Sequence, residues 1–165
     1  MSYDREALKK KFAELQRKLM DETEDIAGPS WPSDITDMHI HYGMHDSVRG
    51  MDAAKLRALL EFRYDFLMEE MGEMRAAIDD GKPEEVVDGL IDLCVVAIGT
   101  LDLFGVDAQR AWDSVLEANM SKRVGVKDSR PNPLGLPDLV KPEGWEAPSH
   151  EGNHGSLPRA LGDGA

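Results

Sequence analysis

Two long apolar segments joined by a short turn constrain the fold of this chain more than any other feature. From Asp52 to about Asp80, apolar side chains recur at steps of three or four, which predicts one continuous helix with an apolar seam. The segment from Pro83 to Phe104 is apolar almost all round its middle, so it predicts a second, central helix. Gly81 ends the first helix and Pro83 suits the first turn of the second. Because this turn is short, the two helices should be antiparallel neighbours.

The rest of the periodic sequence is also helical. Helices are predicted at residues 2–22 and about 107–120, with a short helical turn around His39 to Tyr42. Two prolines and a glycine should break regular structure over residues 27–33. No strand-like alternation competes, so the predicted fold is all-α: an antiparallel bundle of four to five helices, oligomeric through its central helices.

The length of 165 residues and the apolar content of 41% fit one domain. We expect an all-α domain over residues 1–126 and an irregular C-terminal segment over 127–149, a candidate lid. Glycine and proline become frequent after Ser121, and residues 150–165 are predicted to form a disordered tail.

The charge balance restricts the partners of the chain. A formal charge of −13, from 32 acidic and 19 basic residues, repels a phosphate backbone and an anionic membrane surface, so neither is an expected partner. Cys94 is the single cysteine, which rules out an intramolecular disulfide. No stretch approaches the roughly 18 apolar residues of a membrane span, so we expect a cytoplasmic protein.

The second predicted helix carries acidic side chains although it is otherwise apolar. At about 100° per residue, Glu85, Asp88 and Asp92 share one face of the second helix. Asp88 and Asp92 are one turn apart, where like charges repel, and the other helix faces are too apolar to be exposed. Burial of uncompensated carboxylates costs several kcal/mol each, so a cation should lie near them.

The preceding helix adds more negative charge, at Glu69, Glu70 and Glu73. Within two turns of these residues the only basic side chains are Arg63 and Arg75, which makes a salt-bridge network a poor compensation. Carboxylates that converge from two packed helices suit Mg²⁺ or Mn²⁺. The alternative is a solvated acidic helix face without a metal.

These acids belong to an ordered set of motifs that resembles a known superfamily. The set resembles the all-α NTP pyrophosphatases, which include MazG, dimeric dUTPases and phosphoribosyl-ATP pyrophosphatase, and is most similar to the small phage and bacterial MazG-like branch. The resemblance covers roughly residues 36–146. Its motifs are Glu69-Glu70-x-x-Glu73, Glu85-x-x-Asp88, Asp92-Leu-Cys-Val-Val-Ala-Ile-Gly-Thr100 and Ala118-Asn-Met-Ser-Lys122.

The resemblance implies a role for each acid. The metal ligands would be Glu70, Glu73, Glu85 and Asp88, which would hold one to three Mg²⁺ or Mn²⁺ ions. Glu69 would be the catalytic residue that orients or deprotonates water, although it is also a candidate ligand for a further metal. Asp92 lies outside the core pattern and would either complete another metal site or support the ligands.

Other residues are candidates for substrate binding. The expected set is Asn119, Lys122, Arg123 and Lys141, which would contact phosphate or sugar. Simple capping of the helix is the alternative for the first three of these residues. Near Lys141, Trp145 would belong to a lid over the nucleotide or would anchor the tail against the helices.

Two further residues carry open alternatives. His41, with its neighbours His39 and Tyr42, is a candidate wall of the substrate pocket, and a surface or structurally satisfied histidine is the alternative. Asp102 projects roughly from the Asp88 side of its helix, where it would support the metal ligands or lie on the exposed surface.

The predicted function is a metal-dependent nucleoside triphosphate pyrophosphohydrolase that converts an NTP or dNTP to the monophosphate and pyrophosphate. A preference for guanine nucleotides is implied only by analogy with phage relatives, and the host cytoplasm would then be the location. The expected assembly is a homodimer or homotetramer. The alternatives are phosphoribosyl-ATP pyrophosphatase activity and a non-catalytic helical dimerisation module.

Overall fold

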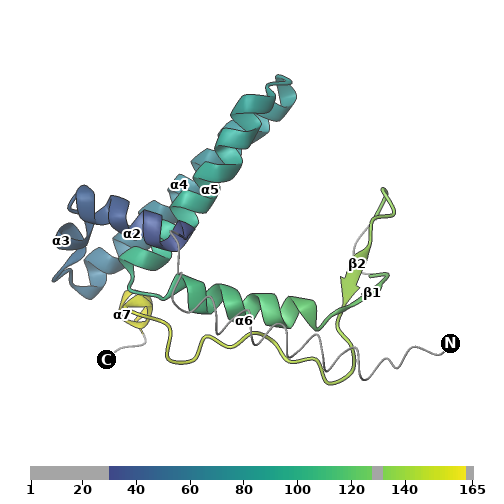
Figure 1. Cartoon of the computed structure of the whole chain (residues 1–165). Coiled ribbons are helices and arrows are strands. Elements are labelled where there is room, and N and C mark those ends of the chain that lie inside the picture. The colour runs from purple at the N-terminus through teal and green to yellow at the C-terminus, as the bar shows by residue number, and fades with distance from the viewer. Residues whose placement is uncertain (1–29, 128–131, 163–165) are drawn as a thin grey trace.

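The hairpin of two long helices is present in the computed structural model, which describes residues 30–127 and 132–162. Its helices are α4 (Ala53–Asp79) and α5 (Pro83–Leu103), which lie side by side and project from the rest of the protein (Figure 1). Asp52 caps α4, because its carboxylate accepts a hydrogen bond of 2.9 Å from the backbone N–H of Lys55. The helix expected at residues 2–22 lies outside the described residues.

Small residues of α5 set how closely its neighbours approach. A Cβ atom at Gly89 would lie 3.1 Å from the Cβ of Met74, so α4 and α5 are in contact at this glycine. A Cβ at Gly99 would lie 3.0 Å from Cε1 of His39 and 3.1 Å from Nη2 of Arg63. The second glycine therefore leaves room for two buried polar side chains at the base of the hairpin.

The N-terminal described helices, α2 (Trp31–His41) and α3 (Met44–Val48), pack at this base. The prediction that residues 27–33 break regular structure is wrong for Trp31–Ser33, which belong to α2. Pro32 lies in the first turn, where its missing N–H costs no helical hydrogen bond. The hydroxyls of Ser30 and Ser33 form a reciprocal capping box that begins the helix.

The apolar core lies at the base of the hairpin. Its buried residues come from α4, from the turn after α5 and from the C-terminal helix α7 (Leu157–Leu161), and they are Leu56, Phe104, Val106 and Ala160. Half-buried side chains such as Val48 on α3 pack around them. The prediction of a disordered tail is therefore wrong for residues 150–162, because α7 supplies part of this core.

Helix α6 (Ala108–Met120) leaves the base in a different direction from the hairpin, with a bend of 118° between α5 and α6 (Figure 1). At its far end, β1 (Arg123–Gly125) pairs antiparallel with β2 (Asp138–Val140). The chain then returns along α6 to α7. Hydrogen bonds hold the returning segment against α6. In one of them, the Trp145 indole N–H donates to the Ala118 carbonyl at 2.8 Å.

The predicted all-α class is confirmed, since the sheet within the described residues has only two short strands. The antiparallel α4–α5 pair is confirmed with it. No single described helix is long and apolar enough to cross a membrane, although α5 and α6 meet those criteria together as a bent pair.

Candidate functional site

Five acidic residues form a group on the hairpin, with the buried side chain of Glu70 at its centre. Glu70 is only 9% exposed, and its pKa is raised above the usual value by burial and by the negative charges of Asp92, Glu73, Glu69 and Asp88, in that order. We call these five residues the acid cluster. Three come from α4 and two from α5, so the cluster exists because the helices pack antiparallel. Such mutual repulsion disfavours the ionised form and attracts a cation.

Basic side chains nearby are engaged with other acids. Arg75 pairs with Asp79 on its own helix, and Lys82 in the turn pairs with Glu85 at 3.2 Å and Asp80 at 3.4 Å. No basic side chain within residues 30–127 and 132–162 forms a salt bridge with the acid cluster. The negative charge of the cluster is therefore not compensated by the described part of the chain.

Arg63 is the buried cation of α4, and it contacts neutral acceptors. Its Nε donates to the Thr100 hydroxyl at 3.0 Å and its Nη2 to the Val96 carbonyl at 2.7 Å. Burial lowers the pKa of this guanidinium. Arg63 therefore ties α4 to the C-terminal half of α5 by hydrogen bonds to Val96 and Thr100, neither of which belongs to the acid cluster.

The acids of α5 that act on Glu70 are not all those of the superfamily pattern. Asp92 is the carboxylate whose charge raises the pKa of Glu70 most, and Asp88 also contributes. Glu85 does not contribute to this shift, and its exposed carboxylate pairs with Lys82. The expected ligands Glu73 and Asp88, and Asp92 with them, are thus near enough for their charges to act on Glu70, although no three carboxylates of the acid cluster within the described residues have ligand oxygens within 4.8 Å of one another. Glu85 is not among the charges that act on Glu70.

The expected substrate-binding residues gather at the far end of α6. Lys122 donates to the Asn119 side-chain oxygen at 2.7 Å, and its ammonium lies 5.4 Å from the centre of the Trp145 ring. The ammonium of Lys141 lies 4.3 Å from the same ring, within the range of a cation–π contact. Arg123 is exposed on β1. In this arrangement Trp145 anchors the C-terminal segment on α6 by its indole hydrogen bond, the second of its two predicted roles.

These basic residues are separated from the acid cluster within one chain. With a helical rise of about 1.5 Å per residue and the 118° bend, Asp92 and Asn119 are on the order of 20 Å apart. Along α6, Trp112, Leu116 and Met120 form a stripe at i, i+4, i+8 whose side chains are 44% to 78% exposed. Within one described chain, the two groups of candidate residues are therefore apart, and the apolar stripe on α6 is exposed.

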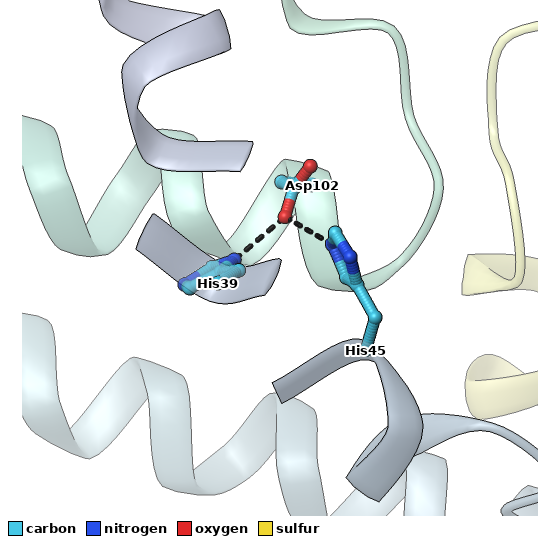
Figure 2. Close-up of side chains that lie close together, drawn as sticks. All are labelled: His39, His45 and Asp102. Atoms are coloured by element: carbon cyan, nitrogen blue, oxygen red, sulfur yellow. Dashed lines mark hydrogen bonds and ion pairs between the residues drawn. The ribbon is translucent and has the colours of Figure 1, made fainter. Parts of the chain in front are cut away.

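A second polar group surrounds Asp102 at the base of the hairpin (Figure 2). Its Oδ2 lies 2.6 Å from Nδ1 of His39 and 2.7 Å from Nε2 of His45, and Oδ1 accepts a hydrogen bond of 2.7 Å from the Thr36 hydroxyl. We call these four residues the Asp102 cluster. It joins α5 to α2 and α3, which lie 57 or more residues earlier in the sequence.

The environment of Asp102 is the reverse of that of Glu70. Burial alone would raise the pKa of Asp102, but hydrogen bonds from Thr36, His39 and His45 outweigh burial and lower it. Asp102 is 14 residues, about 21 Å, along α5 from Asp88, which is too far for it to support that expected ligand.

Two other expectations concern the histidines of this region. His41, the expected pocket wall, is exposed, and its ring packs edge-on against the ring of Tyr42 with 4.7 Å between the ring centres. Its neighbour His39 is buried, at 4% exposure. Sequence reasoning missed His45 and Thr36, because no local spacing links them to Asp102. The signal that remained was Asp102 itself, an acidic residue in the apolar C-terminal half of α5.

A surface cavity lies elsewhere, since its lining includes no residue of the acid cluster or of the Asp102 cluster. It has a volume of about 470 Å³ and lies between α6 and the returning C-terminal segment, lined by Ser114, Trp145 and neighbours. Glu117, Glu143 and Glu146 line it as well, so its own charge disfavours a polyphosphate.

One comparison with known proteins bears on this geometry. The family model described as Phosphoribosyl-ATP pyrophosphohydrolase matches residues 46–119. The matched span contains α4, α5 and nearly all of α6, and with them the whole acid cluster and Asp102. The segments before Asp46, His45 included, and after Asn119 lie outside it. No curated protein matches the chain.

Proposed function

We propose that this chain is a metal-dependent pyrophosphohydrolase that converts an NTP or dNTP to its monophosphate and pyrophosphate. The support is the match of residues 46–119 to the family model of phosphoribosyl-ATP pyrophosphohydrolase, which belongs to the same superfamily as the MazG-like proteins. The superfamily supports pyrophosphohydrolase activity on nucleotides, and the substrate is our inference. The observation that carries it is Glu70, buried among four other carboxylates without a described cation beside it.

The acid cluster fits a divalent cation by its chemistry. Its donors are all carboxylate oxygens, the ligands that Mg²⁺ and Mn²⁺ prefer, and they come from two facing helices. We propose Glu70, Glu73, Asp88 and Asp92 as the ligand set. Glu85 remains a proposed ligand at the edge, and it would have to leave Lys82 to take part.

The chain's own residues would then divide the work of hydrolysis. Bound Mg²⁺ would neutralise phosphate charge and lower the pKa of a water molecule. Glu69, beside Glu70 on α4, is proposed to orient that water and accept its proton. Asn119 and Lys122 are proposed to contact phosphate oxygens, with Arg123 and Lys141 in supporting positions.

This division of work requires a second copy of the chain. The basic residues are on the order of 20 Å from the acid cluster of their own chain, which is too far for one triphosphate to be held by both. We propose that the exposed stripe of Trp112, Leu116 and Met120 packs on another copy, so that α6 carries its basic residues to the partner's acid cluster.

The uncovered apolar surface of the hairpin supports the same assembly. Large side chains on α4 and α5 are 44% to 62% exposed, among them Phe62, Tyr64, Val87 and Ile91. An interaction module without catalysis would also dimerise through such a surface. It would gain nothing from a buried Glu70 among like charges, which is why we favour the enzyme.

Mixed oligomers test the composite site. Glu70→Gln and a Lys122→Ala, Lys141→Ala double variant should each have little activity alone. If every site uses both chains of a dimer, random mixing after unfolding and refolding gives one intact site in half of the dimers, so about a quarter of wild-type activity returns. Sites contained within one chain would return nothing on mixing. Refolded wild type measures the yield of the procedure.

The choice between substrates concerns the group beyond the phosphates. Phosphoribosyl-ATP hydrolysis is the second candidate, because the family model that matches carries that description. A preference for guanine nucleotides rests on analogy alone. Release of pyrophosphate from each common NTP, each dNTP and phosphoribosyl-ATP, compared at equal concentration with Mg²⁺, decides among them.

A further inference from the structure

The Asp102 cluster brings two imidazoles and a carboxylate into an arrangement that the proposed hydrolysis does not use. Nδ1 of His39, Nε2 of His45 and a carboxylate oxygen of Asp102 lie within 4.8 Å of one another. Among the described residues, no other three His, Cys, Asp or Glu ligand atoms converge this closely. Figure 2 shows both rings directed at the same carboxylate, from opposite sides of it.

We propose that His39, His45 and Asp102 form a binding site for a divalent transition metal of the zinc class, separate from the acid cluster. Two imidazole nitrogens and one carboxylate oxygen are the donor set of many zinc sites, and imidazole suits zinc, cobalt and nickel better than magnesium. Asp102 is ten residues, about 15 Å, from Asp92 along α5, so the two sites do not share a ligand.

The surroundings hold the three ligands in place. The Thr36 hydroxyl binds Oδ1 of Asp102 at 2.7 Å, which leaves Oδ2 to face the two rings. Gly99 gives the His39 ring its space, because a Cβ there would lie 3.0 Å from Cε1 and 3.2 Å from Nε2. Hydrogen bonds to a ligand, such as that from Thr36 to Asp102, orient metal ligands in known sites.

Access from solvent is one-sided. The side chain of His39 is 5% exposed and that of Asp102 14%, whereas that of His45 is 33% exposed. An ion would therefore enter past His45, and a water molecule would complete its coordination on that side. Because the ligands belong to α2, α3 and α5, the ion would fasten both short helices to the hairpin.

The alternative is a cluster held by hydrogen bonds alone. Two neutral imidazoles that each donate an N–H to Oδ2 satisfy that oxygen without any ion. The two cases use the same atoms and differ in whether an ion replaces the two protons. A direct measurement of metal binding therefore separates them.

The test uses Co²⁺ and Zn²⁺ with the full chain, free of affinity tags, in the Glu70→Gln, Glu73→Gln background, which weakens the acid cluster. One equivalent of Co²⁺ should produce visible d–d absorption of a low-coordinate site, and Zn²⁺ should displace it. His45→Ala should weaken Co²⁺ binding by about tenfold or more. His41→Ala, an exposed histidine of the same region, is the matched control and should leave the affinity unchanged.

A second readout needs no substitution of the ligands. In the Zn²⁺-loaded chain, ¹⁵N chemical shifts of the histidine rings should show metal at Nδ1 of His39 and at Nε2 of His45, the nitrogens that face Asp102. The proposal is wrong if Co²⁺ gives no d–d absorption, if His45→Ala binds as the parent does, or if the shifts place the metal on other histidines. Because the background removes two of the four proposed ligands of the acid cluster and every readout reports on the histidines, none of these outcomes depends on whether the chain is a pyrophosphohydrolase.

Discussion

Replacement of Glu70 by glutamine should make the metal-free protein more stable. The amide keeps the shape of the side chain and removes its charge from the centre of the acid cluster. The variant removes the repulsion between Glu70 and each neighbouring carboxylate on α4 and α5. Each repulsion that is removed should add a few tenths of a kcal/mol to the free energy of unfolding. The sum is about 0.5 to 1 kcal/mol, which corresponds to a rise of about 1 to 4 °C in Tm for a chain of this size.

The pH dependence of this difference has a definite sign. Burial and the neighbouring carboxylates raise the pKa of Glu70 above its ordinary value of 4.5, so between the two values the folded state binds more protons than the unfolded state. The wild type therefore loses stability as the pH rises through that window. Below about pH 4.5 Glu70 is protonated in both states, and the advantage of Glu70→Gln should disappear.

Mg²⁺ should reverse the order of the two proteins. At a concentration ten times its Kd, a ligand that binds only the folded state adds about 1.4 kcal/mol, more than the repulsion that the variant removes. The wild type should therefore become the more stable protein, while Glu70→Gln gains little. The assay is urea unfolding followed by circular dichroism, in EDTA and in Mg²⁺, across a pH series.

Glu61→Gln is the matched control on the same helix. Glu61 pairs with Arg57 at 2.7 Å and is exposed, so its loss should cost about 0.3 to 0.5 kcal/mol, with no response to Mg²⁺. If Glu70→Gln is instead the less stable protein in EDTA at pH 7.5, the carboxylate of Glu70 has a stabilising partner and the reasoning fails.

Three further predictions concern the ligands, the packing and the substrate. Asp92→Asn should raise the Mg²⁺ concentration for half-maximal activity more than Glu85→Gln does. The opposite order in a metal titration would make Glu85 a stronger ligand than Asp92. Gly99→Ala should lower the free energy of unfolding by about 1 to 3 kcal/mol, because the new methyl group meets the His39 ring, and an unchanged urea midpoint would contradict the packing. Lys122→Ala should raise KM for the triphosphate at least about tenfold with unchanged Tm, and steady-state kinetics with an unaltered KM would remove Lys122 from the site.

The fold was predictable where its signals are local. The α4–α5 hairpin is predicted by the spacing of apolar residues from Leu56 to Ile78 and by the turn at Gly81, and this prediction is confirmed. The order around α7 was not predictable from composition, because a short segment rich in glycine and proline gains its structure from tertiary contacts. Ala160 is buried against Leu56 and Phe104, residues more than fifty positions away in sequence.

The site shows the same division between local and tertiary information. Helical geometry placed Asp88 and Asp92 on one face, and the pKa of Glu70 reflects both charges. The superfamily pattern pointed to Glu85 in preference to Asp92, but it could not include the competing pair with Lys82. The Asp102 cluster joins three elements, so sequence spacing carries no trace of it. The ligand set itself stays a prediction.

The central claim is tested most directly by the products formed from a nucleoside triphosphate. Wild type and Glu70→Gln, both verified as folded, should be incubated with each NTP, dNTP and phosphoribosyl-ATP in Mg²⁺, and the products separated by ion-exchange chromatography. The account predicts equal amounts of monophosphate and pyrophosphate from at least one triphosphate with the wild type, none in EDTA, and little with the variant. Diphosphate and orthophosphate as products, or equal turnover by Glu70→Gln, would contradict it.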